Sequence, residues 1–162
     1  MITVDDYFMG RNSDPRYSGE MTNEIVSNAQ TWVKAANLAL TVFYRDCPLA
    51  ARRKIRSGWR PKEINDATPG AARNSNHMSG IGGDIEDFDG GDADDAPDLA
   101  AWCVNTPGVL AAYGIWMEDP RCTPTWVHWQ TVPPGSGRRF FIPNADWAQR
   151  LAGKQLTSGA LG

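Results

Sequence analysis

The stretch around which the chain is arranged reads Ser75-Asn-His-Met-Ser-Gly-Ile-Gly-Gly-Asp84. It separates His77 from Asp84 by a run rich in glycine, the residue that lets a backbone fold back where a Cβ atom would clash. An imidazole and a carboxylate at this spacing can therefore point at one cation. The second histidine of the chain, His128, lies in Thr125-Trp-Val-His-Trp-Gln130, an aromatic and β-branched run that predicts a buried strand.

Two imidazoles and one carboxylate form a candidate ligand set for zinc. They leave the fourth position of a tetrahedral ion open to water, which is the arrangement of a catalytic zinc site. An ion held in this way lowers the pKa of its water from ~15.7 to about 7, so that hydroxide is available at neutral pH. From spacing alone, an ordinary structural role for either histidine stays open, and so does a cysteine ligand.

The chain resembles a known family at these residues. Ser75-x-His77-x-x-Gly80-x-Gly82-x-Asp84 resembles the Ser-x-His-x-x-Gly-x-Ala-x-Asp signature of the zinc D-alanyl-D-alanine peptidases, whose fold is shared with the Hedgehog signalling domain. Glycine stands here where the signature has alanine. Ser57-Gly-Trp-Arg-Pro61 is similar to the family's Ser-Gly-Tyr-Arg element, and Trp126-Val-His128 is similar to its final metal-binding strand. The chain as a whole further resembles a bacteriophage and prophage branch of that family.

The resemblance implies a fold as well as a site. The expected class is α+β, with helices packed on a small antiparallel sheet as in the Hedgehog/DD-peptidase fold. We expect one peptidase-like domain over residues 1–162, with its motif core at residues 54–130. Residues 152–162 are expected to form a loose tail.

The same resemblance implies roles for individual residues. It assigns one catalytic Zn²⁺ to three ligands: His77, Asp84 and His128. Ser75 is expected to support the site beside the first ligand. Arg60 is expected to contact the substrate or the transition state through its fork of donors, with a plain surface ion pair as the alternative. Further candidates for substrate contact are Trp129 and Gln130.

The acid–base group departs from the family pattern. Many members carry Glu or Asp three residues before the last histidine, where this chain has Thr125, which cannot shuttle a proton at neutral pH. A hairpin that pairs Glu118 with Trp126 puts the glutamate on the face of His128, within reach of a water on the ion. Glu118 is therefore the predicted general base, with Asp119 as the second candidate. A register slip of one residue would turn Glu118 away.

Composition excludes several classes of protein. The 162 residues are 41% hydrophobic and 22% charged, which is typical of a globular protein with a proper core. A net charge of −3 argues against a nucleic-acid partner. Three widely spaced cysteines, Cys47, Cys103 and Cys122, are predicted to be reduced thiols. The N-terminus lacks the features of a secretory signal, and no apolar run is long enough to predict a membrane span.

Periodicity and capping signals predict the remaining elements. Apolar residues at helical spacing predict a long helix from the cap Thr22 to Asp46, and Asp95 predicts the start of another helix. The acidic run at 86–95 lacks the EF-hand pattern, so we expect a solvated loop rather than a calcium site. A loop is predicted at 10–21, a short helix or turn at 62–65, further helices at 107–113 and 144–151, and strands at 54–59, 114–118, 126–130 and 140–142.

These inferences lead to a zinc metallopeptidase of the peptidoglycan D,D-carboxypeptidase or endopeptidase type. Its expected partner is bacterial peptidoglycan, with other phage virion proteins as further candidates. A chain made in the host cytoplasm without a signal peptide would act at the cell wall after release by a holin, or as part of the virion. The alternative is a catalytically inactive structural or cell-wall-binding virion protein that keeps the fold, and Thr125 favours it.

Overall fold

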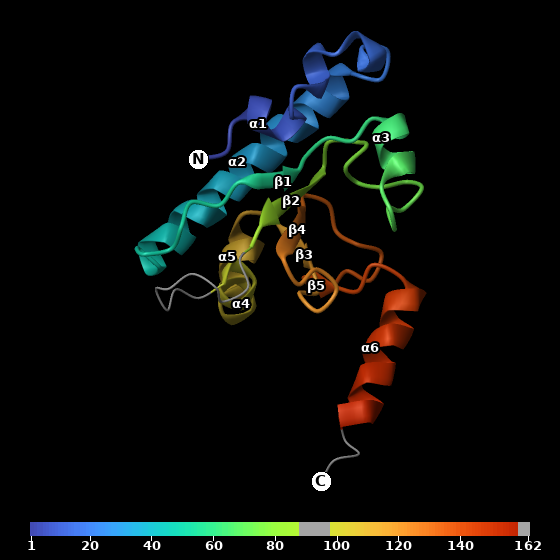
Figure 1. Ribbon diagram of the computed structural model, residues 1–162. Coiled ribbons are helices and arrows are strands. Elements are labelled where there is room, and N and C mark those ends of the chain that lie inside the picture. The colour runs from blue at the N-terminus through green and yellow to red at the C-terminus, as the bar shows by residue number, and fades with distance from the viewer. Residues whose placement is uncertain (88–97, 159–162) are drawn as a thin grey trace.

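The longest described helix, α2 (Asn23–Asp46), lies along one face of a five-stranded sheet (Figure 1). It belongs to a computed structural model that describes residues 1–87 and 98–158, with side chains as far as residue 152. The Thr22 hydroxyl accepts a hydrogen bond from the amide of Ile25 at 3.2 Å, which satisfies one of the free amides of the first turn. The predicted helix is therefore confirmed at both ends. None of the helices in these ranges is long and apolar enough to cross a membrane.

The sheet has the strand order β1-β2-β4-β3-β5. In that order the strands are β1 (Ile55–Ser57), β2 (Gly82–Glu86), β4 (Trp126–Gln130), β3 (Trp116–Glu118) and β5 (Phe140–Phe141). Neighbouring strands pair antiparallel, except that β3 and β5 run parallel. The α+β class is thus confirmed, but the sheet is mixed rather than antiparallel. The reason is that residues 131–139 carry the chain past β3 to its far edge before β5 begins.

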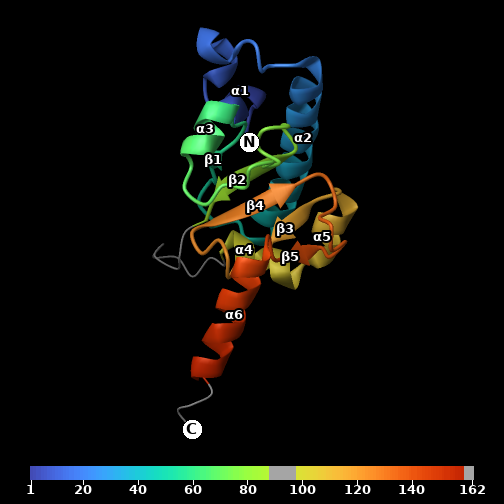
Figure 2. The same cartoon turned by 90° about the vertical axis from the view of Figure 1, so that its right-hand side faces the viewer.

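The two faces of the sheet differ in what they carry. One face is covered by α2, α4 (Leu99–Asn105) and α5 (Pro107–Ala112), and its side chains belong to the apolar core. Four of these side chains are 0% exposed: Ile85, Met117, Val127 and Trp129. The alternate positions carry Asp84, Glu118 and His128 on the other face, which we call the open face. Figure 2 shows β2 and β4 in front of α2.

Helix α2 is joined to the sheet through Trp32. The indole Nε1 of Trp32 donates to the carbonyl oxygen of Trp129 at 2.8 Å. Its ring lies over Gly83, where an added Cβ atom would come within 2.6 Å of the ring. Glycine at this position of β2 therefore sets how closely the helix approaches the strand that carries Asp84.

The remaining helical segments are shorter than α2. They are α1 (Val4–Phe8), the 3-10 turns η1 (Arg11–Ser13) and η2 (Pro15–Tyr17), α3 (Lys62–Ala67) and α6 (Ala145–Ser158). The two 3-10 turns lie where a plain loop was predicted. Helix α6 continues to Ser158, beyond the end predicted for the last helix at residue 151, and the looseness of the segment from residue 152 stays a prediction. Residues 152–156 include Ala, Lys, Gln and Leu, which are strong helix formers and extend the helix. Residues 159–162 lie outside the described part of the chain.

The acidic run, predicted to be a solvated loop, begins inside the fold. The carboxylate of Asp87 is buried and accepts hydrogen bonds from the amides of Leu99 and Ala100, at 2.9 and 2.8 Å. Asp87 therefore satisfies the first amides of α4, and these hydrogen bonds oppose the effect of burial, which still raises the pKa of the carboxyl group. The rest of the run, with the expected loop, the calcium alternative and the helix start at Asp95, lies outside the described residues.

Candidate metal centre

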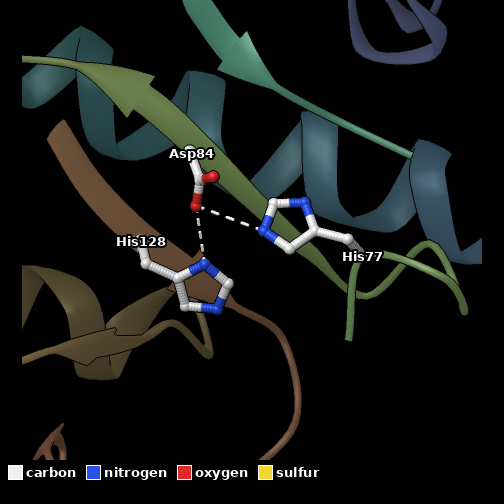
Figure 3. A group of neighbouring side chains, drawn as sticks. All are labelled: His77, Asp84 and His128. Atoms are coloured by element: carbon white, nitrogen blue, oxygen red, sulfur yellow. Dashed lines mark hydrogen bonds and ion pairs between the residues drawn. The ribbon is translucent and has the colours of Figure 1, made fainter. Parts of the chain in front are cut away.

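Three side chains from different parts of the chain meet on the open face of the sheet (Figure 3). Asp84 lies in β2 and His128 in β4, and the pairing of these strands sets the two residues directly opposite each other. His77 comes from the turn that precedes β2. One ligand atom of each residue lies within 4.8 Å of the other two. The fold thus brings together the three residues that the sequence predicts as metal ligands.

The imidazole of His77 is held in one orientation by the backbone. Its Nδ1 atom lies 2.7 Å from the carbonyl oxygen of Gly58. A carbonyl oxygen can only accept, so Nδ1 carries the proton and the lone pair of the neutral ring lies on Nε2. Nε2 is the atom that faces Asp84, at 3.2 Å from Oδ1.

Two lone pairs therefore face each other at the centre of the cluster. Burial lowers the pKa of His77, which disfavours the imidazolium that could donate to Asp84. Two acceptors at this separation need a positive charge beside them. Arg60 supplies part of it, because its Nη2 atom lies 3.2 Å from Nε2 of His77 and 2.8 Å from Oδ2 of Asp84. A metal ion bound among the three ligand atoms would supply the remaining positive charge next to Oδ1 of Asp84.

His128 approaches the same carboxylate oxygen with Nδ1, at 2.8 Å from Oδ1 of Asp84. Burial is the largest single influence on His128 and opposes its charge, but the hydrogen bond to Asp84 and the negative charges of Asp84 and Glu118 together raise the pKa of the imidazole. Burial likewise raises the pKa of Asp84, and the two histidines overcome that effect and hold the pKa well below its ordinary range. Because the ionised Asp84 carboxylate can only accept, Nδ1 of His128 carries a proton when it bonds to Oδ1. A metal ion bound at Nδ1 would displace that proton.

The ligand spacing suits a tetrahedral zinc ion. Ligand atoms about 2.0–2.1 Å from zinc in a tetrahedron lie roughly 3.3 Å apart. The distances from Oδ1 of Asp84 are 3.2 Å to His77 and 2.8 Å to His128, and all three ligand atoms lie within 4.8 Å of one another, so the histidines would move closer together around a bound ion. The cluster contains no cysteine, and all three cysteines are free and buried. Imidazole and carboxylate ligands fit the predicted ion.

Arg60 and Ser75 support the ligands. Arg60 donates through Nε to Oγ of Ser57 at 2.9 Å and through Nη2 to Asp84, so its ion pair is with a buried ligand and not with a surface carboxylate. The hydroxyl oxygen of Ser75 accepts from the amide of His77 at 3.3 Å, which agrees with the supporting role expected of it. A contact of Arg60 with substrate stays a prediction.

Glycine is required in the turn between the ligands. Gly80 has φ +76°, and a Cβ atom there would also lie 2.7 Å from the carbonyl oxygen of Ile25. At Gly82, where the family signature has alanine, a Cβ atom would lie 3.2 Å from Cε1 of His128. The smaller residue therefore lets the His128 ring lie close to β2.

Tyr7 is a supporting residue that the sequence analysis missed. Its hydroxyl donates to the carbonyl oxygen of Gly82 at 2.6 Å, and its own carbonyl oxygen accepts from the amide of Trp59 at 3.1 Å. A Cβ atom at Gly58 would lie 1.7 Å from that carbonyl oxygen. Helix α1 thus ties together the backbone that orients His77 and the strand that carries Asp84. No local pattern in the sequence signals a contact between segments so far apart.

Glu118 lies on the open face across from His128. Met117 pairs with Trp129 in the hairpin, and one step further along this register sets Glu118 opposite His128. The predicted register, with Glu118 opposite Trp126, is therefore wrong by two residues. Because side chains alternate between faces with a period of two, the predicted face is nevertheless correct.

The surroundings of Glu118 suit a proton acceptor. Burial raises the pKa of its carboxyl group, and His128 acts in the opposite direction. None of the hydrogen bonds found within 1–87 and 98–152 uses its carboxylate. Asp119, the second candidate, is instead paired with Arg121 at 2.7 Å, and this hydrogen bonding lowers the pKa of Asp119. Of the two predicted bases, Glu118 is the one with a free carboxylate beside the cluster.

Trp129 and Gln130, the two further candidates for substrate contact, are both buried. Trp129 is 0% exposed and lies on the core face of β4, so the prediction that it contacts substrate is wrong. The alternation of strand residues that puts His128 on the open face turns Trp129 away from it. Gln130 shares the face of His128, but it is 3% exposed and is bonded to Asn76 and to the carbonyl oxygen of Val132.

Comparisons of this chain with family models, with curated proteins and with solved structures find no match. The chemistry of the site therefore follows from its own geometry.

Proposed function

We propose that this chain is a zinc-dependent peptidase that hydrolyses an amide bond in the stem peptides of peptidoglycan. One observation carries the metal-dependent part of the proposal. Nε2 of His77 is an acceptor that faces the carboxylate of Asp84 at 3.2 Å, with Nδ1 of His128 at the same oxygen. A divalent cation fits this arrangement of ligand atoms.

The residues around the cluster suit amide hydrolysis. Bound zinc would polarise the carbonyl group of an amide and activate a water molecule. Glu118 would accept the proton of the attacking water, because its half-buried carboxylate lies across from His128 and is used by none of the hydrogen bonds of the described residues, and burial raises its pKa. Arg60 keeps Asp84 ionised and oriented, and its guanidinium is positioned to stabilise negative charge that develops next to the ligands.

The substrate class comes from the resemblance of the motifs around Arg60, His77 and His128 to the zinc D-alanyl-D-alanine peptidases. The same resemblance favours a phage protein that acts at the bacterial cell wall, either released by a holin or carried in the virion. The geometry of the site supports metal-assisted amide hydrolysis and is compatible with either setting.

The experiment uses purified protein and dye-labelled peptidoglycan sacculi. We expect zinc-loaded protein to release dye, EDTA to stop the release and added zinc to restore it. Glu118→Gln should retain zinc and lose release. Sacculi that stay intact with a zinc-loaded wild-type protein would contradict the proposed activity.

A second candidate is a wall-binding virion protein without catalysis. The observation in its favour is Thr125, which stands where the family pattern has an acid; its hydroxyl accepts from Nη1 of Arg56 at 3.3 Å. In the same assay this candidate predicts that the protein sediments with sacculi and holds zinc but releases no dye.

A further inference from the structure

Strand β1 places two consecutive side chains on the open face. Ile55 pairs with Ile85 and Ser57 pairs with Asp84, so the strand has one extra residue, Arg56, at a β-bulge. In a bulge, two residues of one strand oppose a single residue of its partner. Arg56 is therefore directed to the same side as the metal-ligand cluster, next to Ser57, instead of into the core.

The guanidinium of Arg56 is exposed and has no acidic partner among the described residues. It lies over the ring of Trp126, 4.5 Å from the ring centroid, and donates to the hydroxyl of Thr125 at 3.3 Å. Glu86, which pairs with Trp126 across β2 and β4, makes no ion pair with it within 4.0 Å. Among the described residues, the one side-chain hydrogen-bond acceptor found for Arg56 is thus the neutral hydroxyl of Thr125, at 3.3 Å.

A second stack of arginine on tryptophan, at the other end of the hairpin, has a different role. Arg139 lies over Trp116 with its guanidinium carbon 4.3 Å from the ring centroid. Its Nη1 atom donates to the carbonyl oxygen of Ile115 at 2.6 Å, so this arginine holds the backbone of the sheet. Arg56 makes no such bond to the backbone in the described structure, and its donors remain available to a ligand.

Arg56 lies at a defined distance from the candidate metal centre. Trp126 precedes His128 by two residues on β4, which corresponds to about 7 Å along the strand. An extended peptide that follows the open face covers this distance with about two residues. A group held by Arg56 would therefore lie about two residues from an amide held at the cluster.

We propose that Arg56, stacked on Trp126, is a specificity subsite that binds a carboxylate of the substrate about two residues from the scissile amide. The stack fixes the plane of the guanidinium and leaves its edge free, and that edge offers paired donors that match the two oxygens of a carboxylate. The weak bond to Thr125 gives way to the stronger bond with a charged acceptor. This inference rests on the proposed function, because it concerns the same open face.

The experiment compares three synthetic stem peptides of the sequence L-Ala-γ-D-Glu-L-Lys-D-Ala-D-Ala. One carries both of its carboxylates, one has the glutamate α-carboxylate amidated, and one has the terminal carboxylate amidated. We expect the wild-type kcat/KM to fall roughly ten- to hundredfold for one of the amidated peptides, because amidation removes a charge-assisted pair of hydrogen bonds to Arg56. In Arg56→Gln that discrimination disappears, and in Arg56→Lys part of it remains. Arg52→Gln is the matched control, since Arg52 is an exposed arginine stacked on Tyr44.

Binding of the same peptides to zinc-loaded Glu118→Gln, with and without Arg56→Gln, separates this inference from the proposed function. If the wild type cleaves nothing while Arg56→Gln still abolishes carboxylate-dependent binding, the hydrolase proposal fails and the subsite stands. If the wild type does not discriminate between the peptides, or Arg56→Gln discriminates as the wild type does, the subsite is overturned.

Discussion

The carbonyl oxygen of Gly58 lies 2.7 Å from Nδ1 of His77 and fixes which nitrogen of that ring faces Asp84. The bond joins the end of β1 to the turn before β2, and helix α1 covers the same backbone through Tyr7. The orientation of His77 therefore depends on packing at a distance from the cluster.

Removal of metal is expected to lower the melting temperature by roughly 8–16 °C. Zinc at about 1,000 times its dissociation constant stabilises the folded state by about 4 kcal/mol, and 1 kcal/mol corresponds to about 2–4 °C in a domain of this size. Differential scanning calorimetry before and after EDTA measures the shift. His128→Ala should show little response to EDTA. An unchanged melting temperature in the wild type would count against a bound metal.

Zinc binding is expected to release close to one proton at about pH 6, below the pKa of about 7 of a zinc-bound water. His77 is already neutral because burial lowers its pKa, whereas the bond to Asp84 raises the pKa of His128 above its ordinary value of 6.5. In metal-free protein, the stability from protonated His128 is therefore complete below pH 6.5 and is lost as the pH rises through the folded-state pKa. Zinc binds the neutral ring, so its stabilisation grows over the same range.

Calorimetric titration with zinc in buffers of different ionisation enthalpy counts this proton. The water on the ion keeps its protons at about pH 6, so release of two protons by the wild type at that pH would show that His77 is charged in the metal-free protein, contrary to the assignment of its lone pair.

Glu118→Gln is expected to lower kcat by about 10²–10⁴ while zinc content is unchanged, because the amide keeps the size of the side chain and cannot accept a proton. Asp119→Asn is the matched control, since Asp119 is paired with Arg121. Equal losses in both variants, or full activity in Glu118→Gln, would remove Glu118 from the mechanism.

Tyr7→Phe is expected to destabilise the protein by about 1–3 kcal/mol and to weaken zinc binding, because the carbonyl oxygen of Gly82 loses a buried donor. Urea unfolding and a zinc titration measure the two effects. Tyr17→Phe is the control, as Tyr17 is also buried and its hydroxyl makes none of the hydrogen bonds among the described residues. Zinc affinity that is the same in both variants would show that α1 does not support the cluster.

The three residues of the cluster were predictable from the sequence because the motifs that carry them are local and histidine is rare in this chain. The chain has two histidines, and each lies in a distinctive segment. Helix α2 was predictable for a similar reason, since its apolar period and its cap Thr22 agree. Both signals depend on residues near one another in the chain.

Strand β2 was not predicted, although it carries Asp84. Its residues Gly82–Glu86 combine glycine with acidic side chains, a composition with low strand propensity. Pairing with β1 on one side and β4 on the other compensates for that deficit. Tertiary pairing of this kind leaves no mark on the local sequence.

The register of the hairpin could not be predicted from the sequence either. The connection at 119–125 is held by hydrogen bonds from the amide of Cys122 to the carbonyl oxygen of Asp119, at 2.8 Å, and from the amide of Thr123 to that of Pro120, at 3.1 Å. The sequence alone does not specify these bonds. The face of Glu118 was correct because an even shift preserves it. The bulge at Arg56 was missed because one extra residue in a strand has no compositional signal.

The most direct test of the metal centre is the zinc content and zinc affinity of purified protein after removal of metal by chelation. We expect one zinc ion to bind per chain, and we expect this binding to be lost in each of His77→Ala, Asp84→Ala and His128→Ala but kept in Asp14→Ala, a surface carboxylate control. A wild-type protein that binds no zinc, or zinc binding that persists when Asp84 or His128 is replaced, would contradict the account.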